Sequence, residues 1–166
     1  MLRLKYVFCF TVLAVITVAF CSCSPKATVF SKDGMEITLT EEFTEGKYYD
    51  MTAYYDSENA TVSAFKEEFT LLEENGESSD MTLNEYAEIL MKSGEVNAEV
   101  KTEDGLTYFE YEKTIDYEVY SVTYIYYSVV YKSSDSFWLF QFACEKELYS
   151  EYSEQFEIWA KSVNFE

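Results

Sequence analysis

The stretch YEVYSVTYIYYSVVYKSSDSFWLFQFAC, Tyr117–Cys144, decides the fold of this chain. It predicts two strands, at residues 117–131 and 137–144. From Tyr120 onward both faces of the first strand are largely apolar or aromatic, and both faces of the second are nonpolar except at Gln141. A strand that is nonpolar on both faces needs cover on both sides of its sheet. The rest of the chain must therefore supply two covering layers.

Two segments have the periodicity of helices that could provide this cover. The first spans Leu83–Ser93, where Thr82 and Glu85 form a capping box and Gly94 supplies the stop. Its apolar residues recur at spacings of three and four, which predicts one buried stripe. The second helix is expected near Glu147–Lys161, and its inward stripe consists of Leu148, Tyr152, Phe156 and Trp159.

The remaining strands are short and mostly joined by tight turns, which favours antiparallel pairing over parallel βαβ units. Turns are expected at Asp33-Gly34 and Asp104-Gly105, residue pairs typical of two-residue hairpins. The predicted strands span Thr28–Lys32, Met35–Leu39, Met51–Tyr55, Val62–Leu71, Glu99–Thr102, Leu106–Glu112 and Val163–Phe165. The predicted fold class is therefore α+β, an antiparallel β-sheet flanked by helices in an α/β/α sandwich.

The N-terminus has the pattern of an export signal that ends in a modified cysteine. Arg3 and Lys5 precede the apolar run Tyr6–Phe20, and a small residue stands directly before Cys23. This pattern resembles a bacterial lipoprotein signal. It predicts that residues 1–22 are a signal peptide and that Cys23 is the lipidation site.

The exported protein is expected to have two parts. Residues 23–27 form a lipidated N-terminus with a short linker, and residues 28–166 form a single α+β domain. Several acyl chains on one cysteine hold a membrane firmly, so the predicted location is the extracytoplasmic face of the cell membrane, lipid-anchored. Two alternatives remain open. An uncleaved transmembrane anchor would need about 20 apolar residues, and cleavage to free Cys21 would place the bulky Phe20 before the cysteine.

The composition excludes several classes of function. The chain carries 31 acidic residues against 12 Lys and Arg, and it has no histidine. Its one arginine, Arg3, belongs to the predicted signal, which leaves the exported part with 10 lysines, 31 acids and a formal charge of −21. Without histidine there is no Ser-His-Asp or Cys-His catalysis and no imidazole metal site. The negative charge and the lack of arginine disfavour binding of nucleic acid.

Carboxylates and one cysteine are candidate groups, and each has a structural interpretation beside the functional one. Neighbouring acids such as Glu67 and Glu68 diverge on a strand, so they cannot face each other as glycosidase carboxylates do. The acidic loops at residues 56–59 and 73–80 are rich in oxygen ligands but lack the spacing of a calcium loop. Cys144 is a potential nucleophile, but its apolar surroundings favour a buried small hydrophobe. No catalytic, cofactor-binding or metal-binding residue is predicted.

The sequence has 16 tyrosines, too many for all to be buried. Tyrosine is a good strand former with a polar tip, and it suits a partly covered sheet. An exposed stripe of tyrosines flanked by acids could also stack on sugars or anchor a protein partner. The tyrosines concerned are Tyr48, Tyr49, Tyr54, Tyr55, Tyr108, Tyr111, Tyr117, Tyr120, Tyr124, Tyr126, Tyr127 and Tyr131.

The order of the predicted elements resembles that of the Mog/PsbP-like fold, which includes bacterial lipoproteins of the DcrB type. A hairpin, two strands, a capped helix, long aromatic strands, a terminal helix and the ending Ser162–Phe165 carry this resemblance. Local patterns at Ile37–Thr40 and Asn84–Tyr86 add to it, and it covers about Thr28–Glu166. The resemblance implies a non-enzymatic domain that docks on partners. It assigns no functional residue, because no site motif matches.

The predicted function is that of an extracytoplasmic, membrane-anchored lipoprotein, a non-enzymatic binding or adaptor domain that docks a protein partner. The alternative is a lipoprotein that binds a small molecule or a cation, with a saccharide or calcium as ligand. A hydrolase that uses carboxylates is a third hypothesis. An aromatic patch on an open sheet face would indicate a protein partner. A concave pocket lined by tyrosines and acids would indicate a ligand or an enzyme.

Overall fold

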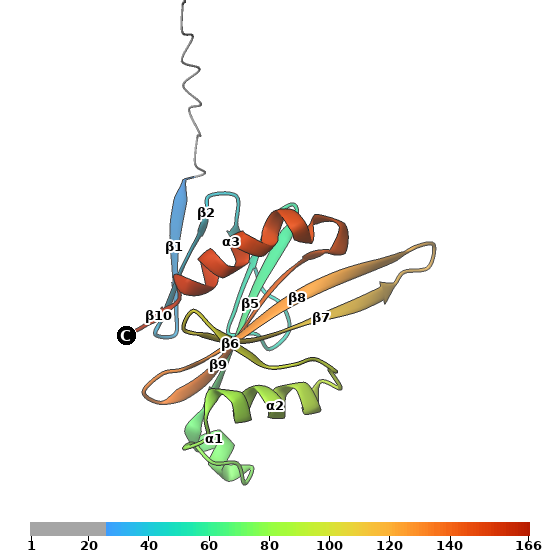
Figure 1. Ribbon diagram of the computed structural model, residues 1–166. Coiled ribbons are helices and arrows are strands. Elements are labelled where there is room, and N and C mark those ends of the chain that lie inside the picture. The colour runs from blue at the N-terminus through green and yellow to red at the C-terminus, as the bar shows by residue number, and fades with distance from the viewer. Residues whose placement is uncertain (1–25) are drawn as a thin grey trace, which may run out of the picture.

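The structure is a computed structural model that describes residues 26–166. The predicted signal peptide, residues 1–22, and the predicted lipidation site, Cys23, lie outside the described residues. Among the helices of the described part, none has the length and apolar character needed to cross a membrane. The described chain has the predicted α+β architecture, with antiparallel sheets and covering helices (Figure 1).

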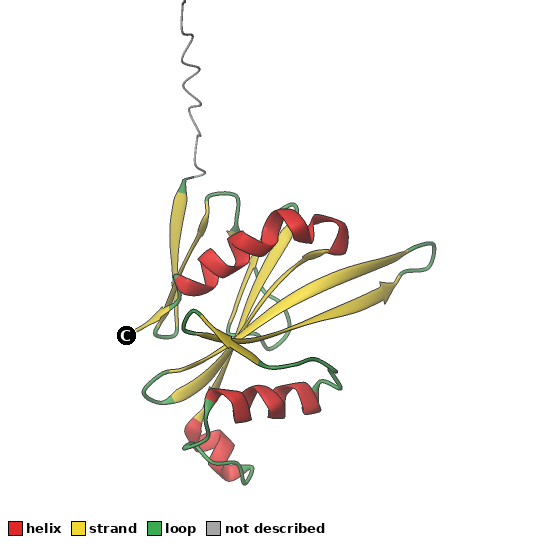
Figure 2. Cartoon of the chain, in the orientation of Figure 1, coloured by secondary structure: helices red, strands yellow, loops and turns green. Residues whose placement is uncertain are grey.

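A seven-stranded antiparallel sheet forms the centre of the molecule (Figure 2). Its strand order is β3-β4-β5-β9-β8-β7-β6, so β9 lies between β5 and β8 and pairs with both over its length. The strands are β3 (Thr44–Glu45), β4 (Ala53–Asp56), β5 (Ala60–Glu68), β6 (Lys101–Glu103), β7 (Leu106–Asp116), β8 (Ser121–Lys132) and β9 (Ser136–Glu145). The predicted antiparallel sheet is confirmed.

A smaller sheet joins the two ends of the described chain. Its order is β1-β2-β10, with β1 at Ala27–Lys32, β2 at Met35–Thr40 and β10 at Asn164–Phe165. The predicted Asp33-Gly34 turn connects β1 and β2, and both residues have positive φ angles of 49° and 86°. Such angles are required in the turn that matches the twist of a two-residue hairpin.

Helices cover the two faces of the large sheet. On one face lie α1 (Phe69–Glu74) and α2 (Leu83–Ser93), and on the other lies α3 (Tyr149–Lys161), preceded by the short 3₁₀ helix η1 (Lys146–Leu148) (Figure 1). The predicted capping box of α2 is present. The Glu85 amide donates to Thr82 Oγ1 at 3.3 Å, and the Thr82 amide donates to Glu85 Oε2 at 2.7 Å.

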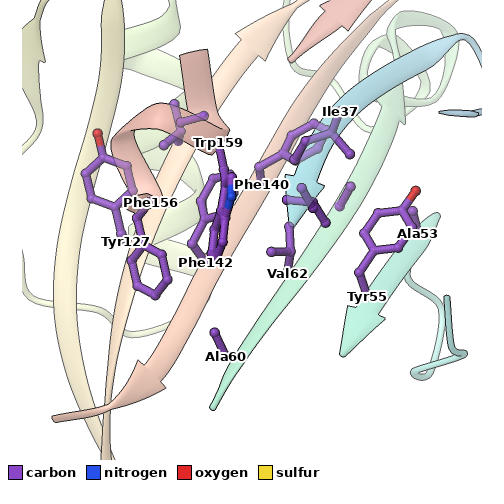
Figure 3. Packing of buried hydrophobic residues seen from close by; sticks show 14 of the residues in the cluster. Ile37, Ala53, Tyr55, Ala60, Val62, Tyr127, Phe140, Phe142, Phe156 and Trp159 are labelled. Atoms are coloured by element: carbon purple, nitrogen blue, oxygen red, sulfur yellow. The ribbon is translucent and has the colours of Figure 1, made fainter. Parts of the chain in front are cut away.

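Each covered face has its own hydrophobic core. On the α3 side, aromatic residues of β9 pack against the helix stripe, with Phe142 5.9 Å from Phe156 and 6.5 Å from Trp159 between ring centres (Figure 3). On the α2 side, Phe137 stacks on Tyr86 at 4.5 Å. Residues from alternate positions of β9 thus belong to different cores, which confirms that this strand needs cover on both faces.

The predicted strand Val62–Leu71 ends too late. β5 stops at Glu68, which pairs with the first residue of β9, Ser136. Beyond that point the chain has no strand to pair with, and Phe69 begins α1 instead. Local sequence did not reveal this helix because it is short, and its only fully buried side chain is Leu72.

One further expectation was wrong in detail. The predicted strand 117–131 begins with a turn, because β7 continues to Asp116 and the chain reverses before β8 starts at Ser121. The aromatic residues in this turn imitate a strand pattern. The predicted stop at Gly94 is confirmed, since Gly94 is the C-cap of α2 with φ of −84°, and the following Glu95 has the positive φ of 53°.

Replacing Phe142 by alanine tests the central packing. This side chain is fully buried, and truncation of a buried phenylalanine lowers the free energy of unfolding by about 3–5 kcal/mol. Urea unfolding of the full chain, followed by the fluorescence of the buried Trp138 and Trp159, measures the loss. Ile158→Ala on the exposed side of α3 is the control and should change the stability by less than about 0.5 kcal/mol. Equal effects of the two variants would contradict this packing.

Candidate functional site

The α2 side of the large sheet is only partly covered by helices. The core formed with α1 and α2 ends at Tyr111 of β7 and Leu139 of β9. Beyond them, toward the β7–β8 turn, tyrosines cover the sheet in place of a helix. We call this surface the tyrosine face, and it carries Tyr48, Tyr49, Tyr54, Tyr111, Tyr117, Tyr120, Tyr124 and Tyr126.

Strand register places these tyrosines around a centre of small residues. Tyr126 of β8 pairs with Tyr111 of β7 on one side and with Ala143 of β9 on the other. Ala143 in turn pairs with Thr61 of β5. Because directly paired residues of neighbouring strands share a face, the small side chains form a strip beside the tyrosines. The ring of Tyr126 therefore lies next to a side chain too small to cover the sheet by itself.

The tyrosine rings are organised by stacking. Tyr111 and Tyr126 are nearly parallel, with centres 4.9 Å apart and 7° between the planes. Tyr48 stacks on Tyr54 at 5.2 Å, and Tyr49 meets Tyr48 edge-on at 4.6 Å. Such aromatic pairs contribute about 0.5–1.5 kcal/mol beyond the area they bury. The face is thus a set of pre-arranged rings.

A hydrogen-bond network fixes part of this surface. Gln141 of β9 donates through Nε2 to Tyr111 Oη at 2.9 Å, and it lies 3.3 Å from Ser128 Oγ. Gln141 is the one polar side chain in the Phe137–Cys144 stretch of β9, and its place on this open side explains why a polar residue is tolerated there. Burial raises the pKa of Tyr126 to about 12, with a smaller effect of the neighbouring Tyr111, so its hydroxyl stays neutral.

The most exposed residues of the tyrosine face lie at its margins. Tyr49 is 87% exposed, and the β7–β8 turn presents Tyr120 at 58% and Val119 at 88%. In Figure 1 the β7–β8 hairpin extends past the other strands, so this turn projects from the body of the domain. Large apolar and aromatic side chains that project into solvent are features of interaction surfaces.

Acidic residues border the tyrosine face. Asp56, Glu58 and Glu145 lie with Tyr124 around a cleft of about 350 Å³ at the β4–β5 turn. The Tyr54 hydroxyl donates to Asp56 Oδ1 at 3.3 Å. Burial, followed by the charge of Asp56, raises the pKa of Tyr54 to about 12. Lys113 of β7 also lies on this face, because it pairs with Tyr124 of β8. The aromatic surface is thus bordered by three acids and one lysine.

Two further hollows flank the sheet. A groove of about 870 Å³ runs between the end of α2 and the sheet and is lined in part by Val96, Phe109 and Tyr111, so it continues the tyrosine face. On the opposite side, a cleft of about 380 Å³ lies between α3 and the β6–β7 hairpin. We call it the α3 cleft. Its acidic residues are Glu103, Asp104, Glu110, Glu154 and Glu157.

The structure also places the other groups singled out from the sequence. Cys144 is 2% exposed on the α3 side of β9, and burial raises the pKa of its thiol to about 11. Among residues 26–166, no three Asp, Glu or Cys side chains gather in a way that could hold a metal ion, and this includes the acidic loops at 56–59 and 73–80. Tyr55 and Tyr127 are buried, while Tyr108 and Tyr131 are half-buried.

Sequence reasoning identified the tyrosines of the face but not their grouping. Which tyrosines share a side follows from the pairing of β8 with β7 and β9, and only the alternation of residues along each strand hinted at it. The α3 cleft was missed. Its acids come from α3, β6, β7 and the turn at Asp104, and no local spacing connects them.

Comparison with known proteins gives a fold and no closer relationship. No protein-family model matches the chain, and no curated protein matches it. The solution structure of cyanobacterial PsbP (CyanoP) from Synechocystis sp. PCC 6803 is similar with a TM-score of 0.54 and 12% identity, covering 90% of this chain and 99% of that one. A crystal structure from Bacteroides thetaiotaomicron VPI-5482 is similar with a TM-score of 0.53 and 10% identity, covering 86% of this chain and 48% of that one.

A third structure is LpqN, described as involved in cell envelope biogenesis of Mycobacterium tuberculosis. Its TM-score is 0.46 at 10% identity, with 84% of this chain and 90% of that chain covered. The similarity to CyanoP, over nearly the whole of both domains, confirms the resemblance that the order of elements predicted: the chain has a PsbP-like fold. At such low identity it shows the fold alone.

The burial of Cys144 makes its thiol unreactive, because the thiolate is the reactive form and a raised pKa leaves almost none at pH 8. We expect the peptide containing Cys144 to remain unlabelled when the native full chain is treated with iodoacetamide at pH 8. In urea the same peptide should become labelled. Peptide mass spectrometry measures the labelling in both states. Rapid labelling of the native protein would make Cys144 a candidate nucleophile again.

Proposed function

We propose that this protein is a non-enzymatic docking domain, anchored to the extracytoplasmic face of the membrane through Cys23, that binds a protein partner with its tyrosine face. The single observation that carries this proposal is the gathering of eight tyrosines on one sheet surface that the described helices leave open. Tyrosine is enriched at the energetic centres of protein interfaces, since it buries a large rigid ring and retains a hydroxyl.

The extent of the face suits a protein more than a small ligand. One partner in a stable complex buries on the order of 800 Å². A tyrosine can bury roughly 200 Å², so eight half-available rings provide a comparable area. The stacked pairs, such as Tyr111 with Tyr126, also lose little conformational freedom on binding, because their rings are already held in place.

The charge around the face specifies the chemistry of the partner. Asp56, Glu58 and Glu145 border the aromatic surface, and the whole chain has a formal charge of −19. Opposite charge at an interface rim speeds association and selects the partner. We therefore expect the partner to present an apolar patch surrounded by lysine and arginine.

The position of the anchor favours a partner held at the same membrane. Only residues 24–26 separate Cys23 from the start of β1 at Ala27. In Figure 1, β1 starts at the end of the molecule far from α1 and α2. A short tether would thus keep that end of the domain, rather than the end with α1 and α2, close to the bilayer.

The docking proposal is tested by Tyr49→Ser combined with Tyr120→Ser, which removes the two most exposed rings of the face. Crosslinking of the tagged full chain in its native cells, followed by mass spectrometry, measures the partner recovered. We expect recovery to fall at least tenfold, since interface tyrosines contribute about 1–2 kcal/mol each.

Ile158→Ser provides the matched control, because Ile158 is 52% exposed on the opposite side of the domain. This variant should recover the partner in full. Loss of the partner with Ile158→Ser, or retention with the double tyrosine variant, would rule out docking at the tyrosine face. Loss of binding to isolated cell-wall glycan, with no protein partner affected, would support the saccharide alternative instead.

The anchor has a separate test in the two cysteines near the end of the apolar run. Cys23→Ala should abolish processing and lipidation, so that the full-length chain accumulates without the added lipid mass. Cys21→Ala should leave both unchanged. Intact-protein mass spectrometry and detergent-phase partitioning measure the outcome. The opposite pattern would move the modified residue to Cys21, and no effect of either variant would exclude a lipid anchor.

A further inference from the structure

The α3 cleft lies on the face opposite to the tyrosine face, and the proposed docking function does not use it. Tyr127 of β8 forms its floor, and Tyr108 of β7 and Tyr149 of α3 belong to its walls. The rings of Tyr108 and Tyr127 are 4.9 Å apart. At about 380 Å³, the cleft falls in the range of sites for small molecules.

The hydroxyl of Tyr127 makes no hydrogen bond within residues 26–166, although only 6% of the residue is exposed. Figure 3 shows this hydroxyl pointing away from the aromatic core around Phe142 and Trp159, and the residue lines the cleft. The hydroxyl oxygen itself is open to the solvent of the cleft, since the buried side-chain atoms without a partner in residues 26–166 are Thr40 Oγ1 and Trp138 Nε1. The floor of the cleft therefore presents a polar atom that a bound molecule could satisfy.

The other two phenols of the cleft are already occupied. Tyr108 donates to Glu103 Oε2 at 3.0 Å, and Tyr149 donates to Glu110 Oε1. Burial, followed by the hydrogen bond to Glu103, raises the pKa of Tyr108 to about 12. These rings are therefore neutral at physiological pH, and the negative charge of the cleft comes from its carboxylates.

The cleft already holds ammonium groups of the chain itself at its rim. Lys101 Nζ lies 3.3 Å from Glu110 Oε2 and 5.7 Å from the centre of the Tyr108 ring. Lys161 pairs with Asp104 and Glu157. The cleft has five acidic residues and only two lysines at its rim, so its net charge is negative. The contacts of Lys101 show the combination that an ammonium finds favourable, a carboxylate together with the face of an aromatic ring.

We propose that the α3 cleft binds a small aliphatic amine, a diamine or a longer polyamine, through its primary ammonium groups. An ammonium has three N–H donors and no acceptor. The Tyr127 oxygen accepts one of these hydrogen bonds at the floor, and the carboxylates of α3 and β7 line the walls on either side. Because Glu154 on α3 and Glu110 on β7 stand on different walls, a chain with charge at both ends fits better than a point charge.

Isothermal titration calorimetry of the full chain in nonionic detergent, with 1,4-diaminobutane at low salt, tests this proposal. We expect binding that weakens as salt is added. Tyr127→Phe should weaken it roughly fivefold, the effect of one lost hydrogen bond. Glu154→Gln should weaken it roughly threefold. Lys101→Ala should strengthen it roughly threefold, since it removes an internal competitor, and a merely structural role would not produce that increase.

The matched control is Tyr126→Phe, which makes the same change one residue earlier in β8 on the opposite face and should leave the affinity unchanged. Far-ultraviolet circular dichroism checks that each variant is folded. The proposal is overturned if the wild-type chain takes up no diamine, if Tyr127→Phe binds as well as the wild type, if uncharged 1,4-butanediol binds equally, or if calcium chloride binds where the diamine does not.

Discussion

Strand β9 carries large apolar side chains on both faces, and such a strand is stable only where both faces are covered. Phe142 points toward α3 and Phe137 toward α2, so the two cores meet across this single strand. The neighbours β5 and β8 pair with it along its length and satisfy its backbone. Placement of α2 and α3 on opposite faces follows from this requirement, because each helix has one apolar stripe to bury.

The helices are too short to cover the whole sheet, and tyrosine supplies the rest of the cover. Next to Ala143, the side chain of Tyr126 lies on this face of the sheet and stays partly exposed. A phenylalanine there would cover the strip equally well but would expose an apolar edge. The same residues that complete the fold thus create a surface rich in rings and hydroxyls. On this side of the sheet, the residues that stabilise the fold are also the residues of the candidate interface.

The sequence predicted those structural features that are encoded by a few neighbouring residues. The cap at Thr82, the stripe of α3 and the two Asp-Gly turns are each encoded within a few residues, and the structure has all of them. The start of β8 and the existence of α1 were not predictable in this way. A strand ends where its partner ends, as β5 does opposite Ser136, and that is a property of the pairing rather than of either segment. The α3 cleft was hidden for the same reason, since its walls come from distant segments.

The two faces of the large sheet differ in chemistry because they are covered differently. Where tyrosines lie over the sheet, the surface is mainly aromatic, and its charged residues, such as Lys113 and Glu145, flank Tyr124. Where α3 crosses the sheet edge, its polar side faces the β6–β7 hairpin, and acids from both elements line the same cleft as the mostly buried side chain of Tyr127. In a chain this acidic, bringing five carboxylates together costs free energy through mutual repulsion. Lys101 and Lys161 at the rim offset only part of that repulsion, so any cation that enters the cleft stabilises the folded domain as well as binding to it.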